Sequence, residues 1–216
     1  YYHNAVNDSR IAKAKRKKRK YQKISKEIST KYQVPQKYIY ALWGIETDFG
    51  SNKGRFYVVN SLANLAFEGR RRKLFENELY FALQMIRDKQ VNVKYFKGSW
   101  AAAFGQCQFM PTSFYTYAID HNKDGKKNIW YDHQDIFASI ANSLAKPGWD
   151  NSHSWGYEVR FTKKANLRRY LKKSKSVKLA KFQRFGLLHN NGRKFTEAEE
   201  QLDVKLLKLD DRYFLV

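Results

Sequence analysis

Glu46 is the first residue whose type and position could do chemistry. Ile39, Leu42, Trp43 and Glu46 follow the spacing of one face of a helix. A carboxyl group on an apolar face loses hydration when it ionises, so its pKa should rise. A carboxyl group that stays protonated near neutral pH can act as a general acid. The same spacing also fits a surface glutamate at the end of an amphipathic helix.

No second acid accompanies Glu46 in the local pattern. Glycosidases that use two carboxyl groups hold them about 5–10 Å apart. Asp48 is a poor partner, because residues i and i+2 point to different sides of a helix. If the chain is a glycosidase, we expect it to work with a single carboxylate.

Residues 98–111, with the sequence GSWAAAFGQCQFMP, form a second candidate segment. Its small residues would let a ligand approach the backbone, and its serine, glutamines and rings could bind a sugar. The alternative is a buried loop whose polar groups bond to one another. Cys107 has no obvious base beside it, so we interpret it as a buried structural thiol.

A third candidate, the polar loop 120–135, begins like an EF-hand calcium loop. The candidate ligands are Asp120, Asn122, Asp124 and the backbone carbonyl of Lys126. Position 12 is Tyr131 instead of glutamate, so Asp132 or Asp135 would have to supply the last ligand. Lysines in and beside the loop oppose a cation. A structural calcium site and an Asx-rich turn without metal both remain open.

Hydrophobic spacing and the positions of Gly and Pro predict a mainly helical scaffold. The predicted helices cover residues 10–33, 34–50, 61–89, 111–118 and 135–146. The long one, 61–89, could be two helices, since three arginines at 70–72 interrupt it. Alternating residues 155–161 predict a strand, and residues 204–216 could hold one or two more.

These elements give a mainly α (α+β) fold in three parts. Residues 1–33 are a basic helical segment, and residues 34–162 are the core that contains the polar loop. Residues 163–216 are a second basic segment with short strands. The sequence shows no internal repeat.

Composition supports a folded protein with an anionic partner. The 216 residues include 16% aromatic side chains and carry a net charge of +22. Nucleic acid, anionic lipid and an anionic cell-wall polymer all fit such a charge. Neither basic segment matches a named nucleic-acid motif, so we expect no nucleic-acid partner. No stretch approaches the roughly 18 apolar residues of a membrane span.

Four segments, in this order along the chain, together resemble the lytic murein transglycosylase B family. They are residues 41–50 (ALWGIETDFG), 98–111, 117–130 and 155–159. The resemblance runs from about Arg10 to the C-terminus. It implies a lysozyme-like helical core with a small β-containing accessory region and an EF-hand-like loop.

The resemblance also implies an activity on peptidoglycan. Family members cleave the β-1,4 bond between N-acetylmuramic acid and N-acetylglucosamine and leave 1,6-anhydromuramic acid ends. Glu46 would protonate the leaving oxygen and then, as a carboxylate, take the proton of the muramoyl C6 hydroxyl. Ser99 and Gln108 match positions that line the sugar site, and Phe109 and Tyr117 are weaker candidates for ring contacts.

Further expectations follow from the same resemblance. We expect a monomer that binds peptidoglycan strands in the bacterial periplasm or cell envelope, with any membrane anchor upstream of Tyr1. We expect no cofactor in the chemistry. The family's C-terminal part, with an Asn-Phe and a Tyr-Asn motif, should begin at about Val216, so either that part is absent from this chain or the protein differs there. The alternatives are a lysozyme-like hydrolase and a non-catalytic peptidoglycan-binding protein.

Overall fold

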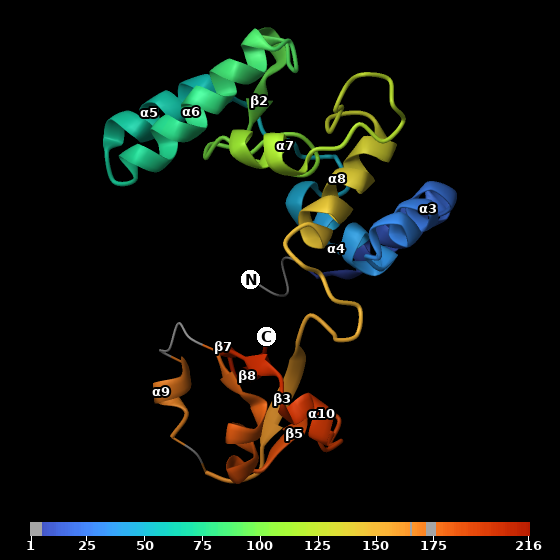
Figure 1. Cartoon of the computed structure of the whole chain (residues 1–216), viewed down its shortest axis with the longest axis vertical. Helices are drawn as coiled ribbons and strands as arrows, with labels where there is room; N and C mark the ends of the chain where they lie inside the picture. Colours follow the sequence, from blue (N-terminus) through green and yellow to red (C-terminus); the bar gives the residue numbers. More distant parts are fainter. Residues whose placement is uncertain (1–5, 165, 172–175) are drawn as a thin grey trace. The chain divides into compact units, whose positions relative to one another are not determined.

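The computed structural model describes residues 6–164, 166–171 and 176–216, which form two compact units (Figure 1). The first unit ends at Asn151 and the second begins at Ser152. The first unit is helical and the second is built around an antiparallel sheet. The predicted mainly helical α+β fold is therefore confirmed.

The first unit contains the residues that could do chemistry. Its helices are α2 (Asp8–Lys20), α3 (Gln22–Tyr32), α4 (Gln36–Thr47), α5 (Val58–Glu68), α6 (Arg72–Arg87), α7 (Pro111–Tyr117) and α8 (His133–Ala145). A short 3-10 helix, η1 (Val93–Tyr95), precedes strand β2 (Lys97–Gly98), which pairs with β1 (Phe56–Tyr57). The predicted long helix is two helices, because Gly69 at φ 90° ends α5.

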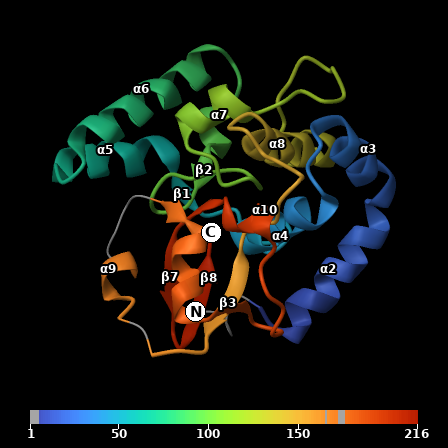
Figure 2. The same cartoon turned by 60° about the horizontal axis from the view of Figure 1, so that its bottom comes forward.

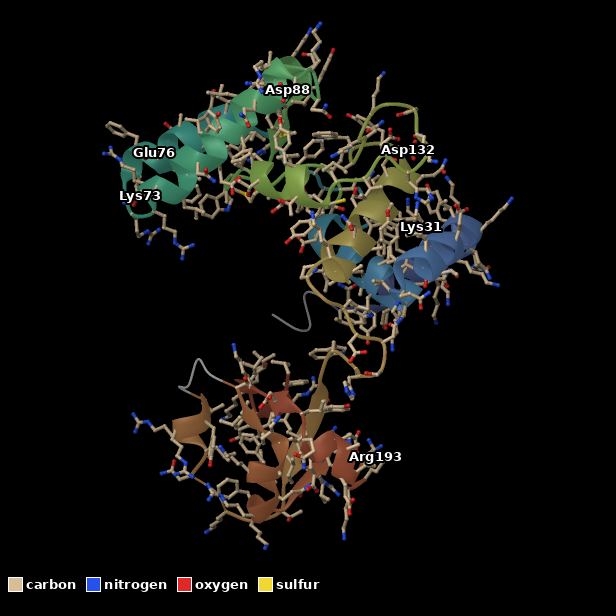
Figure 3. The ribbon with its side chains drawn as sticks, in the orientation of Figure 1. Lys31, Lys73, Glu76, Asp88, Asp132 and Arg193 are labelled. Carbon is tan, nitrogen blue, oxygen red and sulfur yellow. The ribbon has the colours of Figure 1, made fainter. Side chains whose placement is uncertain are left out.

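The basic N-terminal helices belong to this unit. α2 buries none of its residues, but α3 buries Ser25 and Ile28 against α4 and α8. The hydroxyl of Tyr40 on α4 donates a hydrogen bond of 2.9 Å to Ser25 Oγ. Lys31, in the last turn of α3, stays exposed (Figure 3). Of the segment 1–33, set apart in the sequence analysis, residues 1–5 lie outside the described residues, and the helices that follow contribute packing to the helical core.

The second unit holds most of the strands. Its elements are β3 (Tyr157–Phe161), α9 (Arg168–Leu171), β4 (Val177–Lys178), the 3-10 helix η2 (Leu179–Phe185), β5 (Leu187–His189), α10 (Glu197–Glu200), β6 (Asp203–Val204), β7 (Leu206–Leu209) and β8 (Arg212–Leu215). The main sheet has the antiparallel order β5-β3-β8-β7, of which Figure 2 shows β3, β8 and β7, and β4 pairs with β6. Buried Leu179, Phe182 and Leu215 anchor its own hydrophobic core.

The boundary between the units differs from the one drawn on the sequence. The sequence analysis assigned residues up to 162 to the core. In the structure β3 pairs with β5 and β8, so it lies in the second unit. Local alternation identified the strand, but the partners that fix its unit are up to 58 residues away in sequence, as Tyr157 pairs with Leu215.

No helix in the described part of the chain is long and apolar enough to cross a membrane.

Candidate active site

Helix α4 carries Glu46 in its last turn. Ile39 and Trp43 are fully buried on the inner face of the helix, whereas Glu46, three residues after Trp43, reaches the surface. Asp48 and Phe49 adopt left-handed backbone angles with φ of 49° and 58°, which ends the helix at Thr47. The helix therefore fixes the backbone of Glu46 to the core and leaves its carboxyl group accessible.

A cleft of about 590 Å³ surrounds the accessible side of Glu46. Its lining comes from α4, from the loop after it and from the segment around β2. The lining residues are Glu46, Ser51, Asn52, Lys53, Gly54, Arg55, Phe56, Ser99, Trp100 and Gln108. The structure thus brings together Glu46, Ser99 and Gln108, which the sequence analysis chose from two distant segments.

Glu46 is the one carboxylic acid among the described residues that line this cleft. Its side chain is exposed, yet the surrounding protein removes enough water from the carboxyl group to raise its pKa. Lys53 and Arg55 add positive charge to the same wall. The cleft therefore offers one proton donor and basic side chains.

Asp48 points to a different partner. Lys13 Nζ on α2 donates to Asp48 Oδ2 at 2.5 Å, and Arg10 Nε lies 3.5 Å from Asp48 Oδ1. The hydrogen bond from Lys13 lowers the pKa of Asp48. Asp48 is thus an ionised residue that fastens α2 to the end of α4, and it is absent from the cleft lining.

Gln106 joins α4 to the second candidate segment, and the sequence analysis did not single it out. Its side chain is buried, accepts a 2.7 Å hydrogen bond from Trp43 Nε1 and donates a 2.8 Å bond to the Trp130 carbonyl. Thr47 Oγ1 donates to the Gln106 carbonyl at 3.3 Å. A glutamine with both ends of its amide satisfied fixes the loop against the helix. The available signal was its place in the segment 98–111, between Gly105 and Cys107.

Glycines allow the two walls of the cleft to meet. A Cβ at Gly54 would lie 2.0 Å from the carbonyl carbon and oxygen of Gly98, and Gly54 has φ +85°. Any larger residue at position 54 would push the loop after α4 away from β2. This contact places Lys53 and Arg55 opposite Ser99 and Trp100.

The side chains of Ser99 and Gln108 are held by hydrogen bonds to backbone groups of nearby residues in the same loop. Ser99 Oγ accepts a 3.1 Å hydrogen bond from the Ala103 amide, and Gln108 Nε2 donates at 3.0 Å to the Gly105 carbonyl. Trp100 beside them is 68% exposed although it is a large apolar residue. An exposed indole on a cleft wall is a natural platform for a sugar ring.

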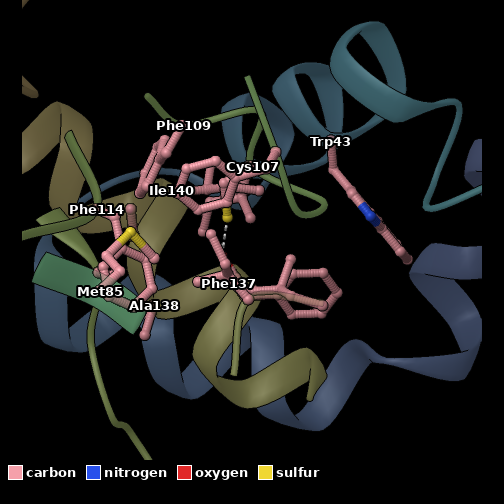
Figure 4. Close-up of a cluster of buried hydrophobic side chains, with 14 of the residues drawn as sticks. Trp43, Met85, Cys107, Phe109, Phe114, Phe137, Ala138 and Ile140 are labelled. Carbon is pink, nitrogen blue, oxygen red and sulfur yellow. Dashed lines mark hydrogen bonds between the residues drawn. The ribbon is translucent and has the colours of Figure 1, made fainter. Parts of the chain in front are cut away.

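Phe109 and Tyr117 lie outside this lining. Phe109 is 8% exposed and belongs to the hydrophobic core, with its ring centroid 6.2 Å from that of Tyr117. Figure 4 shows Phe109 beside Cys107 and Ile140 in the same cluster. Their positions give no support to a sugar contact in this cleft, because the Phe109 ring is turned into the core.

Cys107 is buried in this cluster, as interpreted from the sequence. It is 6% exposed, and its thiol lies 3.6 Å from the Ile136 carbonyl (Figure 4). Burial raises the pKa of the thiol well above its usual value, so it stays protonated.

The polar loop 120–135 is organised by its own hydrogen bonds. Asp135 is fully buried, and its two carboxylate oxygens accept the backbone amides of His121 and Asn128 at 2.7 Å each. Asp132, and not Asp135, caps α8 by accepting the Gln134 amide at 2.7 Å. The buried carboxylate at 135 therefore closes the loop at its base.

The donor set of this loop does not fit an EF-hand calcium site. Both oxygens of Asp135 accept a backbone amide, and Asn122 turns its amide nitrogen toward Asp132 Oδ2 at 2.8 Å. Tyr131, at the position of the bidentate glutamate, is exposed. Within residues 6–164, 166–171 and 176–216, no three His, Cys, Asp or Glu side chains gather as a metal site. Hydrogen-bonding turns organise the loop, with Asp120 accepting the backbone amides of Asp124 and Gly125.

Comparison with known proteins identifies relatives of this chain. Over 119 residues, 55% of this chain, the sequence is 40% identical to membrane-bound lytic murein transglycosylase B of Escherichia coli strain K12, of which 33% is covered. SltB3 from Pseudomonas aeruginosa, solved in complex with NAG-NAM-pentapeptide and with NAG-anhNAM-pentapeptide, matches with a TM-score of 0.87 and 33% identity. That match covers 100% of this chain and 58% of SltB3.

Another similar structure is the Escherichia coli lytic transglycosylase Slt35 in complex with calcium. It matches with a TM-score of 0.82 and 25% identity, over 98% of this chain and 67% of Slt35. The chain spans less than two thirds of the length of transglycosylase B and of SltB3. The family model described as a transglycosylase SLT domain matches residues 1–214. A match over nearly the whole sequence shows that the chain belongs to the transglycosylase SLT domain family.

Proposed function

We propose that this chain is a lytic transglycosylase that cleaves the β-1,4 bond between N-acetylmuramic acid and N-acetylglucosamine in peptidoglycan. The observation that carries the proposal is the cleft in which Glu46, with a raised pKa, is the one carboxylic acid among the described lining residues. Its relatives add support, since SltB3 was solved with NAG-NAM-pentapeptide and NAG-anhNAM-pentapeptide.

A single carboxyl group is enough for this reaction. Glu46 donates its proton to the glycosidic oxygen as the bond from C1 of the muramoyl residue breaks. The Glu46 carboxylate then accepts the proton of the C6 hydroxyl of the same sugar as that oxygen bonds to C1. The product ends in a 1,6-anhydro ring, Glu46 regains its proton, and no water is consumed.

The other cleft residues bind and orient the glycan strand. The Ser99 hydroxyl and the Gln108 amide are placed to bond sugar hydroxyl and acetamido groups, and the Trp100 indole can stack on a ring. Lys53 and Arg55 supply positive charge for carboxylates of the substrate. We place this activity in the bacterial periplasm, with the chain acting as a monomer on peptidoglycan strands.

Mass spectrometry of the ends produced from purified peptidoglycan tests this proposal. We expect muropeptides that end in 1,6-anhydromuramic acid. Reducing ends in their place would identify a lysozyme-like hydrolase. Binding to peptidoglycan with no new ends would identify a non-catalytic binding protein, provided that a chain extended past Val216 is also inactive.

The raised pKa of Glu46 predicts how activity depends on pH. Glu46 must be protonated before it can donate, and desolvation keeps it protonated to a higher pH than an ordinary glutamate. We expect kcat/KM to fall about tenfold per pH unit above this pKa. Initial rates at constant ionic strength measure this, since salt alone weakens binding by a chain of charge +22. A rate that rises as Glu46 ionises would contradict its role as the acid.

We also propose that the loop 120–135 keeps its structure without calcium. Its support is the internal bonding of Asp135 and the Asn122 amide nitrogen directed at Asp132. We expect about 1 mM CaCl2 to change the melting temperature by less than about 1 °C relative to a chelator, since a ligand stabilises only by binding the native state. A calcium-dependent rise of several degrees would show that the loop binds the ion.

A further inference from the structure

The second unit has an unusual distribution of charge. Between Glu158 and Glu197 the sequence contains thirteen Lys and Arg residues and no Asp or Glu. A pocket of about 640 Å³ opens within this segment, lined by Asn166, Arg168, Arg169, Arg184 and Phe185. All of these lining residues belong to the second unit, so the pocket is separate from the cleft around Glu46.

Two of the arginines are held together by one hydroxyl group, that of Tyr170. Tyr170 is 7% exposed, and its hydroxyl oxygen accepts hydrogen bonds from Arg169 Nη2 at 2.7 Å and Arg184 Nη2 at 2.5 Å. Both bonds end on the same oxygen, so the two guanidinium nitrogens cannot be farther apart than the sum of the bonds, about 5.2 Å. Like charges held this close repel each other unless an anion lies near them.

The protein supplies no such anion in its described part. No carboxylate of residues 6–164, 166–171 and 176–216 lies within ion-pair distance of Arg168, Arg169 or Arg184. The positions that the structure does not describe are neither Asp nor Glu. Burial opposes ionisation of Tyr170, but the two guanidinium groups outweigh it and lower the pKa of this phenol. The local field therefore favours negative charge.

The side chains are also arranged to receive a ligand. The Arg169 guanidinium lies 4.7 Å from the Tyr170 ring centroid, and the Arg184 guanidinium lies 4.7 Å from the Phe185 centroid. Stacking on rings limits the motion of both guanidinium planes, which keeps their N–H forks available. Such forks bind carboxylate and phosphate groups in pairs of parallel hydrogen bonds.

We propose that this arginine pocket is a second peptidoglycan-binding site that takes the carboxylates of the stem peptides. The proposal rests on the proposed function, because peptidoglycan presents peptide carboxylates along the same polymer that Glu46 would cleave. A concave pocket suits a peptide end better than a flat lipid surface. It would hold the chain on the polymer between cleavage events without taking part in the chemistry.

Binding to insoluble peptidoglycan tests this pocket. The variant Arg169→Gln/Arg184→Gln is compared with Lys181→Gln/Lys194→Gln, which removes the same charge from exposed positions of the same unit outside the pocket. Both are made in Glu46→Gln protein, so that the polymer stays intact. We expect the arginine variant to bind about tenfold more weakly, which is the loss of one or two charge-assisted bonds. The lysine variant should change by less than about twofold.

Two further arms identify the ligand and separate this proposal from the proposed function. Amidating the peptide carboxylates of the polymer should remove the difference between the two variants. With Glu46 restored, cleavage of a peptide-free glycan should be equal in both variants. Equal binding by both variants, or a difference that survives amidation, would overturn the arginine pocket and leave the role of Glu46 untouched. If the arginine variant bound vesicles or DNA more weakly than the lysine variant but bound peptidoglycan equally well, the proposal would likewise be overturned.

Discussion

Glu46→Gln is expected to reduce the cleavage of peptidoglycan by about 10³-fold or more. General acid–base assistance contributes about 10²–10⁴-fold in enzymes, and here one carboxyl group serves as both acid and base. Glutamine keeps the size and hydrogen-bonding reach of the side chain but can neither donate nor accept the proton. Release of soluble muropeptides at equal protein concentration measures the loss.

The fold should tolerate this change. The Glu46 side chain is exposed, and partial desolvation of its carboxyl group raises its pKa. The ionised side chain therefore gives the folded state no advantage. We expect an unchanged or slightly higher melting temperature. Glu76→Gln is the matched control, since Glu76 lies exposed on α6 outside the cleft (Figure 3). Full activity in the Glu46 variant, or loss in the Glu76 variant, would contradict the assignment.

Gln106→Leu is expected to have the largest effect on stability. The change leaves Trp43 Nε1 and the Trp130 carbonyl without their hydrogen bonds of 2.7 and 2.8 Å to the glutamine amide. A buried polar group without a partner costs about 1–3 kcal/mol, so the loss should be about 2–4 kcal/mol. Denaturant unfolding of the first unit, followed by tryptophan fluorescence, measures it.

Activity should fall in the same variant, because Gln106 fixes the loop that carries Ser99 and Gln108 to the helix that carries Glu46. Gln90→Leu, at an exposed position on the same unit, provides the comparison and should stay within about 0.5 kcal/mol of the wild type. If Gln106→Leu is as stable as the wild type, the amide bridge contributes nothing to the fold.

Local patterns predicted much of the scaffold and part of the site. Helical spacing located the helix of Glu46. The family resemblance, and not a local pattern, pointed to Ser99 and Gln108, which line the same cleft as Glu46. The helix prediction succeeded because hydrophobic periodicity reports directly which face of an element is buried.

Long-range packing accounts for what the sequence did not predict. The Gln106 bridge depends on Trp43, 63 residues away, and no local pattern reports such a partner. Strand β3 joined the second unit because Val159 pairs with His189 and Tyr213. Phe109 was chosen for its ring, but the left-handed backbone at Gln108 (φ 49°) is part of a turn that directs Phe109 into the core.

The most direct test of the central claim is digestion of peptidoglycan by the wild-type chain in water enriched in oxygen-18. If Glu46 acts alone and the C6 hydroxyl attacks C1, the new ends are 1,6-anhydro rings without solvent oxygen, and Glu46→Gln produces none. New reducing ends that carry oxygen-18 would show that water is the acceptor, and the account of a single carboxylate working without water would be wrong.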